Sequence, residues 1–199
     1  MKINYITIDG VIGVGKTTLA IMLAEKFNGS NLLEVVEENP FLVDFYKDAR
    51  RYAFPTQLFF LLSRYRQQQA ILQQDLFHNI LISDYLFAKD KIFAYLNLED
   101  RELFLYERII KLLEKDIVKP DLTIYLKSSP ERLMQNIQKR GRAFEKDISC
   151  DYIVSLNNAY NHFFNHYQDT ILLTINTTEM DFVNRSDDFE KIVQQILEI

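Results

Sequence analysis

The stretch Gly10-Val11-Ile12-Gly13-Val14-Gly15-Lys16-Thr17 decides the fold of this chain. It has the pattern G-x-x-x-x-G-K-S/T, and it lies between the apolar run Tyr5 to Ile8 and a helix-forming segment that begins at Thr18. In this pattern the backbone N–H groups turn toward phosphate oxygens, the lysine reaches the β and γ phosphates, and the hydroxyl binds Mg²⁺. The order of strand, loop and helix therefore predicts a phosphate-binding loop and a nucleoside triphosphate site.

Seven residues of this segment are expected to bind the triphosphate. They are Gly10, Gly13, Val14, Gly15, Lys16, Thr17 and Thr18. The helix that follows adds the positive end of its dipole at the same anion. A glycine-rich turn with a coincidental Lys-Thr pair is the alternative interpretation, and the flanking strand and helix argue against it.

Composition limits the classes of partner. The chain has 199 residues, 48% of them hydrophobic, and a net charge of −5, which disfavours a nucleic-acid footprint and allows one domain over residues 1–199. Cys150 is the single cysteine, which excludes an internal disulfide and fits a reducing compartment. There is no signal-peptide pattern and no apolar run long enough for a membrane span. We expect a soluble, cytoplasmic protein with no membrane partner.

Apolar segments and helical periodicities alternate along the chain. Strands are expected at 2–9, 32–36, 78–83, 122–126 and 171–175. Helices are expected at 18–25, 41–52, 56–76, 85–96, 100–117, 129–141, 151–167 and 188–197, with Phe54-Pro55 marking a new start. Such alternation predicts an α/β fold with a five-stranded parallel sheet and helices on both faces.

Acidic residues follow two of the expected strands. In open α/β sheets ligands bind outside the carboxyl ends of the strands, where Glu34 and Asp84 are placed beside the phosphate loop. Phosphoryl transfer to a hydroxyl requires a metal, cations on the moving group, and a carboxylate that orients or deprotonates the acceptor. Either acid could instead cap a helix or be a solvated charge, and Glu37 or Glu38 could take the place of Glu34. Whether Glu34 or Asp84 accepts the proton stays open.

Two arginines, Arg140 and Arg142, lie in a turn after an expected helix. Their guanidinium groups could fold onto the phosphates as a short lid, or could simply be cations that favour a helix C-terminus. No apolar strand ends in D-x-x-G and no N-K-x-D motif is present, so a GTPase is disfavoured. A kinase of a small molecule is the preferred interpretation.

Six further stretches match a known family together with G-V-I-G-V-G-K-T-T from Gly10. They are E-V-V-E-E-N-P-F-L from Glu34, F-Y-K-D-A-R-R-Y-A-F from Phe45, Q-L-F-F-L-L-S-R-Y from Gln57, S-D-Y-L-F-A-K-D from Ser83, P-D-L-T-I-Y-L from Pro120 and K-R-G-R from Lys139. Along nearly its whole length the chain resembles the deoxynucleoside kinase family, most closely its bacterial deoxyadenosine/deoxyguanosine/deoxycytidine kinase branch. The resemblance implies a P-loop kinase fold, a homodimer, and transfer of the γ-phosphoryl of Mg-ATP to the 5′-hydroxyl of a deoxynucleoside, purine or deoxycytidine favoured, in nucleotide salvage.

The resemblance also implies roles for individual residues. Glu34 would touch the 5′-hydroxyl, Asp84 and Thr17 would hold Mg²⁺, and Lys16, Arg140 and Arg142 would stabilise the moving phosphoryl group. The acceptor would be held by Tyr46 and Glu145 at its 3′-hydroxyl and by Gln57, Arg64 and Asp90 at its base. Glutamine suits a base edge because its amide offers both a donor and an acceptor.

The sequence departs from the family pattern at two positions. Tyr85 stands where the family usually has the arginine of a D/E-R-S motif, so a cation near the 5′-oxygen must come from elsewhere or be absent. Asn136 stands one turn before Arg140, where some relatives have a further arginine. Two rival functions stay open, a nucleoside monophosphate kinase and a nucleotide-binding regulatory protein without turnover.

Overall fold

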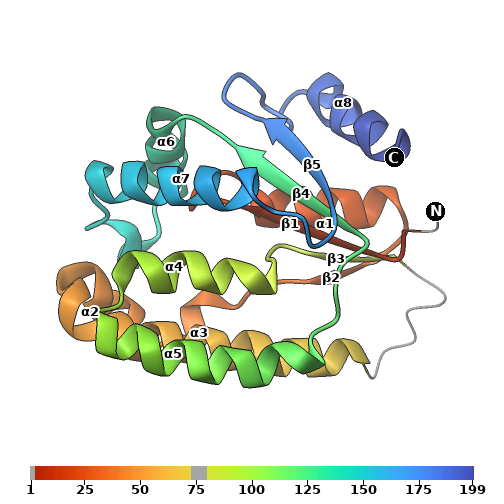
Figure 1. The fold of residues 1–199 in the computed structure, drawn as a ribbon. Helices are drawn as coiled ribbons and strands as arrows, with labels where there is room; N and C mark the ends of the chain where they lie inside the picture. Colours follow the sequence, from red (N-terminus) through yellow and green to blue (C-terminus); the bar gives the residue numbers. More distant parts are fainter. Residues whose placement is uncertain (1–2, 73–79) are drawn as a thin grey trace.

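The computed structural model describes residues 3–72 and 80–199. Within them the strands are β1 (Tyr5–Gly10), β2 (Ser30–Leu32), β3 (Leu81–Ser83), β4 (Leu122–Lys127) and β5 (Ile171–Asn176). They form one sheet in the order β2-β3-β1-β4-β5, and every neighbouring pair is parallel (Figure 1). The predicted five-stranded parallel sheet is confirmed.

Helices cover both faces of this sheet (Figure 1). They are α1 (Lys16–Lys26), α2 (Leu42–Lys47), α3 (Ala49–Leu72), α4 (Asp90–Asn97), α5 (Asp100–Leu113), α6 (Pro130–Arg140), α7 (Cys150–Asn165) and α8 (Ser186–Leu197). Short 3₁₀ turns are η1 (Val36–Glu38), η2 (Phe87–Lys89), η3 (Glu114–Asp116) and η4 (Ala143–Glu145). α1 and α8 lie on one face, and α4 and α7 lie on the other, with α3 and α5 packed beyond α4.

The central strands are buried because they are covered on both sides. All six residues of β1 are buried, and so are the first five of β4. Their side chains form one core with the buried faces of α1 and α8, to which Leu19, Leu23 and Ile192 belong. Continuous apolar strands of this kind are typical of parallel sheets. No helix in the described ranges has the length and apolar character needed to cross a bilayer.

The phosphate loop connects β1 to α1 and requires glycine at particular positions. Gly15 forms the N-cap of α1 with φ 102°, a left-handed conformation that a residue with a Cβ rarely adopts. A Cβ on Gly10 would lie 2.5 Å from the carbonyl oxygen of Leu126 in β4. The loop can therefore lie against the sheet only with glycine at its start.

Two predicted boundaries on the β2 and α3 side are wrong. β2 ends at Leu32, so residues 33–36 are not a strand, because its partner β3 ends at Ser83 in the same register. α3 does not begin at Pro55 but passes through it, and its first turns are held by buried Ala53 packing on Leu42 and Phe45. Tertiary packing thus outweighs the proline signal. The ends of the helix expected at 56–76 and the start of the strand expected at 78–83 fall partly outside the described residues.

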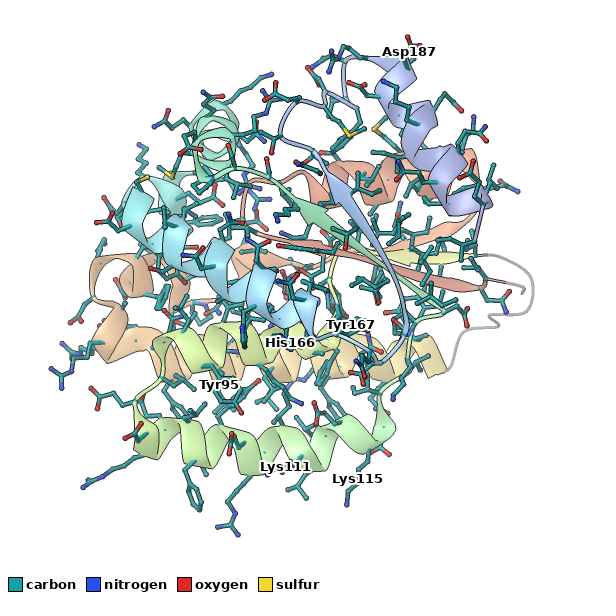
Figure 2. All side chains as sticks on the ribbon, turned by 45° about the horizontal axis from the view of Figure 1, so that its top comes forward. Tyr95, Lys111, Lys115, His166, Tyr167 and Asp187 are labelled. Atoms are coloured by element: carbon teal, nitrogen blue, oxygen red, sulfur yellow. The ribbon has the colours of Figure 1, made fainter. Side chains whose placement is uncertain are left out.

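Other helix ends follow local sequence signals more closely. Ser129 caps α6 by accepting from the Arg132 N–H at 3.3 Å, and the helix ends at Gly141 with φ 67°, as predicted. The helix expected from residue 85 begins at Asp90, because residues 84–86 form an extended turn before η2. Figure 2 shows side chains filling the space between α4 and α5, with exposed Lys111 and Lys115 at the outer edge.

Candidate active site

Lys16 lies at the start of α1 and folds back over its own loop. Its Nζ donates to the carbonyl oxygens of Gly10 at 2.7 Å and Val11 at 3.1 Å. Burial and the neighbouring positive charge of Lys89 together lower the pKa of Lys16 to about 8, although the acids Asp9 and Glu34 oppose this shift. The ammonium is thus held among groups that an anionic phosphate would replace as its partners.

Asp84 joins the carboxyl ends of three strands. Its Oδ2 accepts from the hydroxyl of Thr17, at the end of the phosphate loop, at 2.5 Å. Its Oδ1 accepts from the backbone N–H of Glu34, which follows β2, at 2.8 Å. The carboxylate itself follows β3 directly. The expected meeting of strand ends is therefore present, and it brings the Thr17 hydroxyl and the Asp84 carboxylate into contact.

Asp9, which was not among the predicted site residues, supports the same region from inside the sheet. Its fully buried carboxylate accepts from the N–H of Gly10 at 2.7 Å and from the N–H of Leu86 at 2.9 Å. Burial raises the pKa of Asp9, and the charges of Lys89 and Lys16 oppose that rise. Asp9 thereby ties the start of the phosphate loop to the turn that carries Asp84.

Glu34 is clamped between two cations. Arg64 of α3 donates to its Oε1 from Nε at 2.6 Å and places a second nitrogen at 2.6 Å, and Lys89 of η2 donates to its Oε2 at 3.0 Å. Burial raises the pKa of Glu34, but the charges of Arg64 and Lys89 outweigh burial and lower it to about 2. Glu34 is consequently a permanently ionised hydrogen-bond acceptor at neutral pH. Lys89 was not among the predicted site residues, since a lysine in the charged run Lys89-Asp90-Lys91 gives no signal of burial.

Asp90 is fully buried against Arg64 and Gln57, and its expected place in the base pocket stays a prediction. Its carboxylate accepts from Arg64, from the amide of Gln57 and from the hydroxyl of Tyr106, the last at 3.0 Å. Gln57 Nε2 also donates to the Asp90 carbonyl at 2.8 Å. Asp90 therefore fixes the orientation of Arg64 and Gln57, which do line the cavity.

Most of the predicted site residues line one cavity, called here the inner cavity. Its walls come from the phosphate loop, α2, α3, α4, η4 and α7. The predicted residues on it are Gly13, Lys16, Thr17, Glu34, Tyr46, Gln57, Arg64, Asp84, Arg140, Arg142 and Glu145. Aromatic rings complete it, namely Phe45, Phe60, Phe93, Phe144, Tyr152 and Tyr160. An enclosure of aromatic rings with a few fixed polar groups suits a planar heterocycle with hydroxyl substituents.

The arginines expected to form a lid are neutralised by carboxylates. Arg140 donates to Glu145 from two nitrogens, at 2.5 Å and 3.1 Å, and Arg142 pairs with Glu37 at 3.0 Å. Burial raises the pKa of Tyr46, and the nearby Glu145 charge adds to that rise. Tyr46, Arg140 and Glu145 thus gather at one side of the inner cavity.

A second, outer cavity lies on the other side of the phosphate loop. It is lined by Gly13, Val14, Gly15 and Thr18 of the loop, by Arg132, Asn136, Lys139 and Arg140 of α6, and by Thr177 and residues 180 to 184 after β5. The Asn136 amide donates to the Gly13 carbonyl at 2.8 Å. Gly13 and Arg140 line both cavities, so the phosphate loop forms the partition between two compartments.

Comparison with known proteins agrees with this architecture. The family model described as deoxynucleoside kinase matches residues 6–199. A deoxyguanosine kinase of Bacillus subtilis is 38% identical over 200 residues, covering 98% of this chain and 97% of the relative, and a deoxyadenosine/deoxycytidine kinase of the same organism is 29% identical over 206 residues, covering 100% and 94%. A structure of deoxyadenosine kinase from M. mycoides, with products dCMP and a flexible dCDP bound, has a TM-score of 0.85 at 26% identity over 98% of this chain and 100% of that chain. The chain belongs to the deoxynucleoside kinase family.

Proposed function

We propose that this protein transfers the γ-phosphoryl group of ATP to the 5′-hydroxyl of a deoxynucleoside. One observation carries the proposal: two cavities meet at a phosphate loop, with Gly13 and Arg140 on both. A two-substrate transfer requires a donor compartment and an acceptor compartment whose reacting atoms meet at one point. The outer cavity is the donor side, and the inner cavity is the acceptor side.

On the donor side the triphosphate lies along the loop from Gly10 to Thr18. Backbone N–H groups and the N-terminus of α1 hold the phosphates, and Lys16 leaves its carbonyl partners to reach the β and γ phosphates. Arg140 and Arg142 exchange Glu145 and Glu37 for phosphate oxygens, which completes the lid. The nucleotide base lies in the outer cavity.

Thr17 and Asp84 fit a magnesium ion. Mg²⁺ prefers hard oxygen ligands and takes one or two protein oxygens together with phosphates and water, and these two oxygen-bearing groups lie side by side. The described residues contain no group of three acidic, histidine or cysteine side chains placed to hold a metal. When bound, the ion supplies charge neutralisation on the β and γ phosphates.

On the acceptor side Glu34 accepts the 5′-hydroxyl hydrogen bond. With a pKa of about 2 it is a weak base, and its contribution is orientation and negative charge at the hydroxyl. This is sufficient because phosphoryl transfer has a loose transition state in which the acceptor proton leaves late. Tyr46 and Glu145 hold the 3′-hydroxyl, while Gln57 and Arg64 read the base.

The relatives support a purine deoxynucleoside or deoxycytidine as acceptor. The curated relatives above are named for deoxyguanosine, deoxyadenosine and deoxycytidine. Gln57 and Arg64, which line the inner cavity together with the aromatic walls, suit bases that carry an exocyclic amino or carbonyl group. We further propose that the protein is cytoplasmic, forms a homodimer and acts in nucleotide salvage. Light scattering can measure the mass of the dimer.

The test is a phosphotransfer screen with Mg-ATP against deoxyguanosine, deoxyadenosine, deoxycytidine and thymidine, with the four monophosphates in parallel. Formation of a 5′-monophosphate from a purine deoxynucleoside or deoxycytidine is expected. Turnover of monophosphates alone would show a nucleoside monophosphate kinase instead. Nucleotide binding without turnover of any acceptor would support a regulatory protein and contradict the proposal.

A further inference from the structure

Lys89 is a buried lysine that none of the roles above requires. It ends η2, only 3% of its surface is exposed, and it lies on the wall of the inner cavity together with Lys16 and Asp84. A lysine is rarely buried to this extent, because desolvation of the ammonium group costs free energy unless a partner offsets it. Its position therefore calls for a reason beyond chance packing.

The contacts of Lys89 leave part of its hydrogen-bonding capacity for a ligand. Within the part of the chain that the structure describes, its Nζ has one hydrogen-bond partner, Glu34 Oε2 at 3.0 Å. An ammonium group has three N–H donors. The Nζ also lies 5.8 Å from the centre of the Tyr85 ring, whose face favours a cation but satisfies no N–H donor. Donors therefore remain for an oxygen atom that enters the inner cavity.

Neutralisation of Glu34 does not account for Lys89. Arg64 already places two nitrogens at 2.6 Å from Glu34 Oε1. Lys89 occupies the other oxygen, and its charge is felt by Lys16 across the cavity, as the lowered pKa of Lys16 records. Lys89 thus contacts the carboxylate of the acceptor side and lines the same cavity as the lysine of the phosphate loop, where the two substrates would meet.

The residue after Asp84 supplies no charge at that point. Tyr85 is fully buried, is absent from the lining of the inner cavity, and its carbonyl accepts from Ser83 Oγ at 2.8 Å. The cation expected beside Asp84 is therefore missing from the cavity at its sequence position. Lys89, five residues later, is a cation that the fold brings to the same wall.

We propose that Lys89 is a second catalytic cation, which donates to the 5′-oxygen and to the phosphoryl group that arrives on it. The proposal rests on the proposed kinase function. The bond from the 5′-oxygen to phosphorus forms as the bond from phosphorus to the β-phosphate oxygen breaks. ADP leaves with that electron pair, and the hydroxyl proton passes by way of Glu34 to solvent. Lys89 stabilises the negative charge that develops on the transferred group.

The experiment compares Lys89→Met and Lys89→Arg with a matched control, Lys91→Met. Lys91 lies two residues later, outside the inner cavity, and pairs at 2.5 Å with Glu114. For each variant kcat and KM are measured with Mg-ATP, and dissociation constants are measured for deoxyguanosine, deoxyadenosine and their 5′-monophosphates. Thermal unfolding is followed in parallel, and Lys89→Gln replaces Lys89→Met if the latter does not fold.

Lys89→Met is expected to lower kcat by about 10² to 10³, the usual loss for one electrostatic donor at a transition state. Lys89→Arg retains a cation and should recover at least about a tenth of the wild-type kcat. Lys91→Met should change kcat less than about threefold, because Lys91 lies outside the inner cavity. Affinity for the 5′-monophosphate should fall about tenfold more than affinity for the deoxynucleoside, since the monophosphate alone carries the anionic group that Lys89 contacts.

Equal losses of affinity for the deoxynucleoside and its monophosphate would overturn the proposal, because Lys89 would then act through Glu34 alone. A kcat for Lys89→Met within threefold of wild type would overturn it as well. Failure of the kinase function is recognised separately, because it appears as a wild-type protein that phosphorylates no deoxynucleoside. The difference between the two binding constants can be measured even then.

Discussion

The two cavities on either side of the phosphate loop are built on different principles. The inner cavity is made of buried charges that depend on one another: Arg64 bridges Glu34 and Asp90, and Lys89 shares Glu34. The outer cavity is made mainly of loop backbone and half-buried or exposed side chains from α6 and the segment after β5. The Asn136 amide donates to the Gly13 carbonyl and so connects the wall of the outer cavity to the loop.

This difference corresponds to what each side would have to recognise. Phosphates are shared by all nucleotides, so backbone N–H groups and a helix N-terminus suffice to bind them. A specific deoxynucleoside needs donors and acceptors in fixed directions, and buried ion pairs fix directions because each charge needs its partner. Substitutions in the inner cavity should therefore cause large losses of stability or turnover. Substitutions in the outer cavity should cause small changes that are limited to ATP binding.

The largest effect is expected from Arg64→Met. It leaves the buried carboxylate of Asp90 without its cation, and breaking a buried pair typically lowers the free energy of unfolding by about 3 to 5 kcal/mol. Denaturant unfolding measures this loss. The matched control is Arg50→Met, whose pair with Glu99 is 86% and 59% exposed and should change stability by less than about 1 kcal/mol. Similar losses for both variants would show that burial of an ion pair does not decide how much it contributes to stability.

Glu34→Gln tests whether the inner cavity serves the acceptor alone. The amide keeps the shape but removes the charge at the 5′-hydroxyl, so kcat should fall by about 10² or more, the usual value of an acid–base group. ATP affinity, measured by calorimetry, should remain within about threefold of wild type, since Glu34 lies on the acceptor side. Near-normal turnover would transfer the role to Asp84.

A pH effect is expected on the donor side. Lys16 has a pKa of about 8 in the ligand-free protein, and bound phosphates would raise it by favouring the charged ammonium. ATP binding above pH 8 must therefore take up a proton, and affinity should fall about tenfold per pH unit between pH 8 and 10. Calorimetry in two buffers of different ionisation enthalpy measures the proton uptake. In Lys16→Arg the loss of ATP affinity above pH 8 should disappear, because the guanidinium group stays charged. A loss that persists would show that another group titrates.

The smallest effect is expected from Asn136→Ala. Loss of one hydrogen bond to the phosphate loop should raise KM for ATP by about three- to tenfold, in line with a net value of about 1 kcal/mol. KM for the deoxynucleoside should be unchanged. Gln138→Ala, an exposed position on the same helix, serves as the control. An equal effect on both substrates would mean that Asn136 also organises the inner cavity.

Several features of the site could be predicted because they follow from short-range rules. The phosphate loop is a continuous motif, and the meeting of Glu34 with Asp84 follows from the parallel order of β2 and β3. Boundary errors occurred where long-range packing decides, as at Pro55 inside α3 and at the early end of β2. Local propensity competes with tertiary contacts at such places and loses.

The sequence by itself determined the sheet, the phosphate loop and the family, because strand periodicity and contiguous motifs are local properties of the chain. The tertiary structure alone decided which charged side chains pair with one another on the acceptor side. Lys89 donates to Glu34, which is 55 positions earlier in the sequence, and Asp90 pairs with Arg64 and accepts a hydrogen bond from Gln57. Such pairings depend on where η2, α3 and β2 come together in space. Burial decides these pairings, because each ammonium or carboxylate group that is removed from water needs an opposite charge close to it.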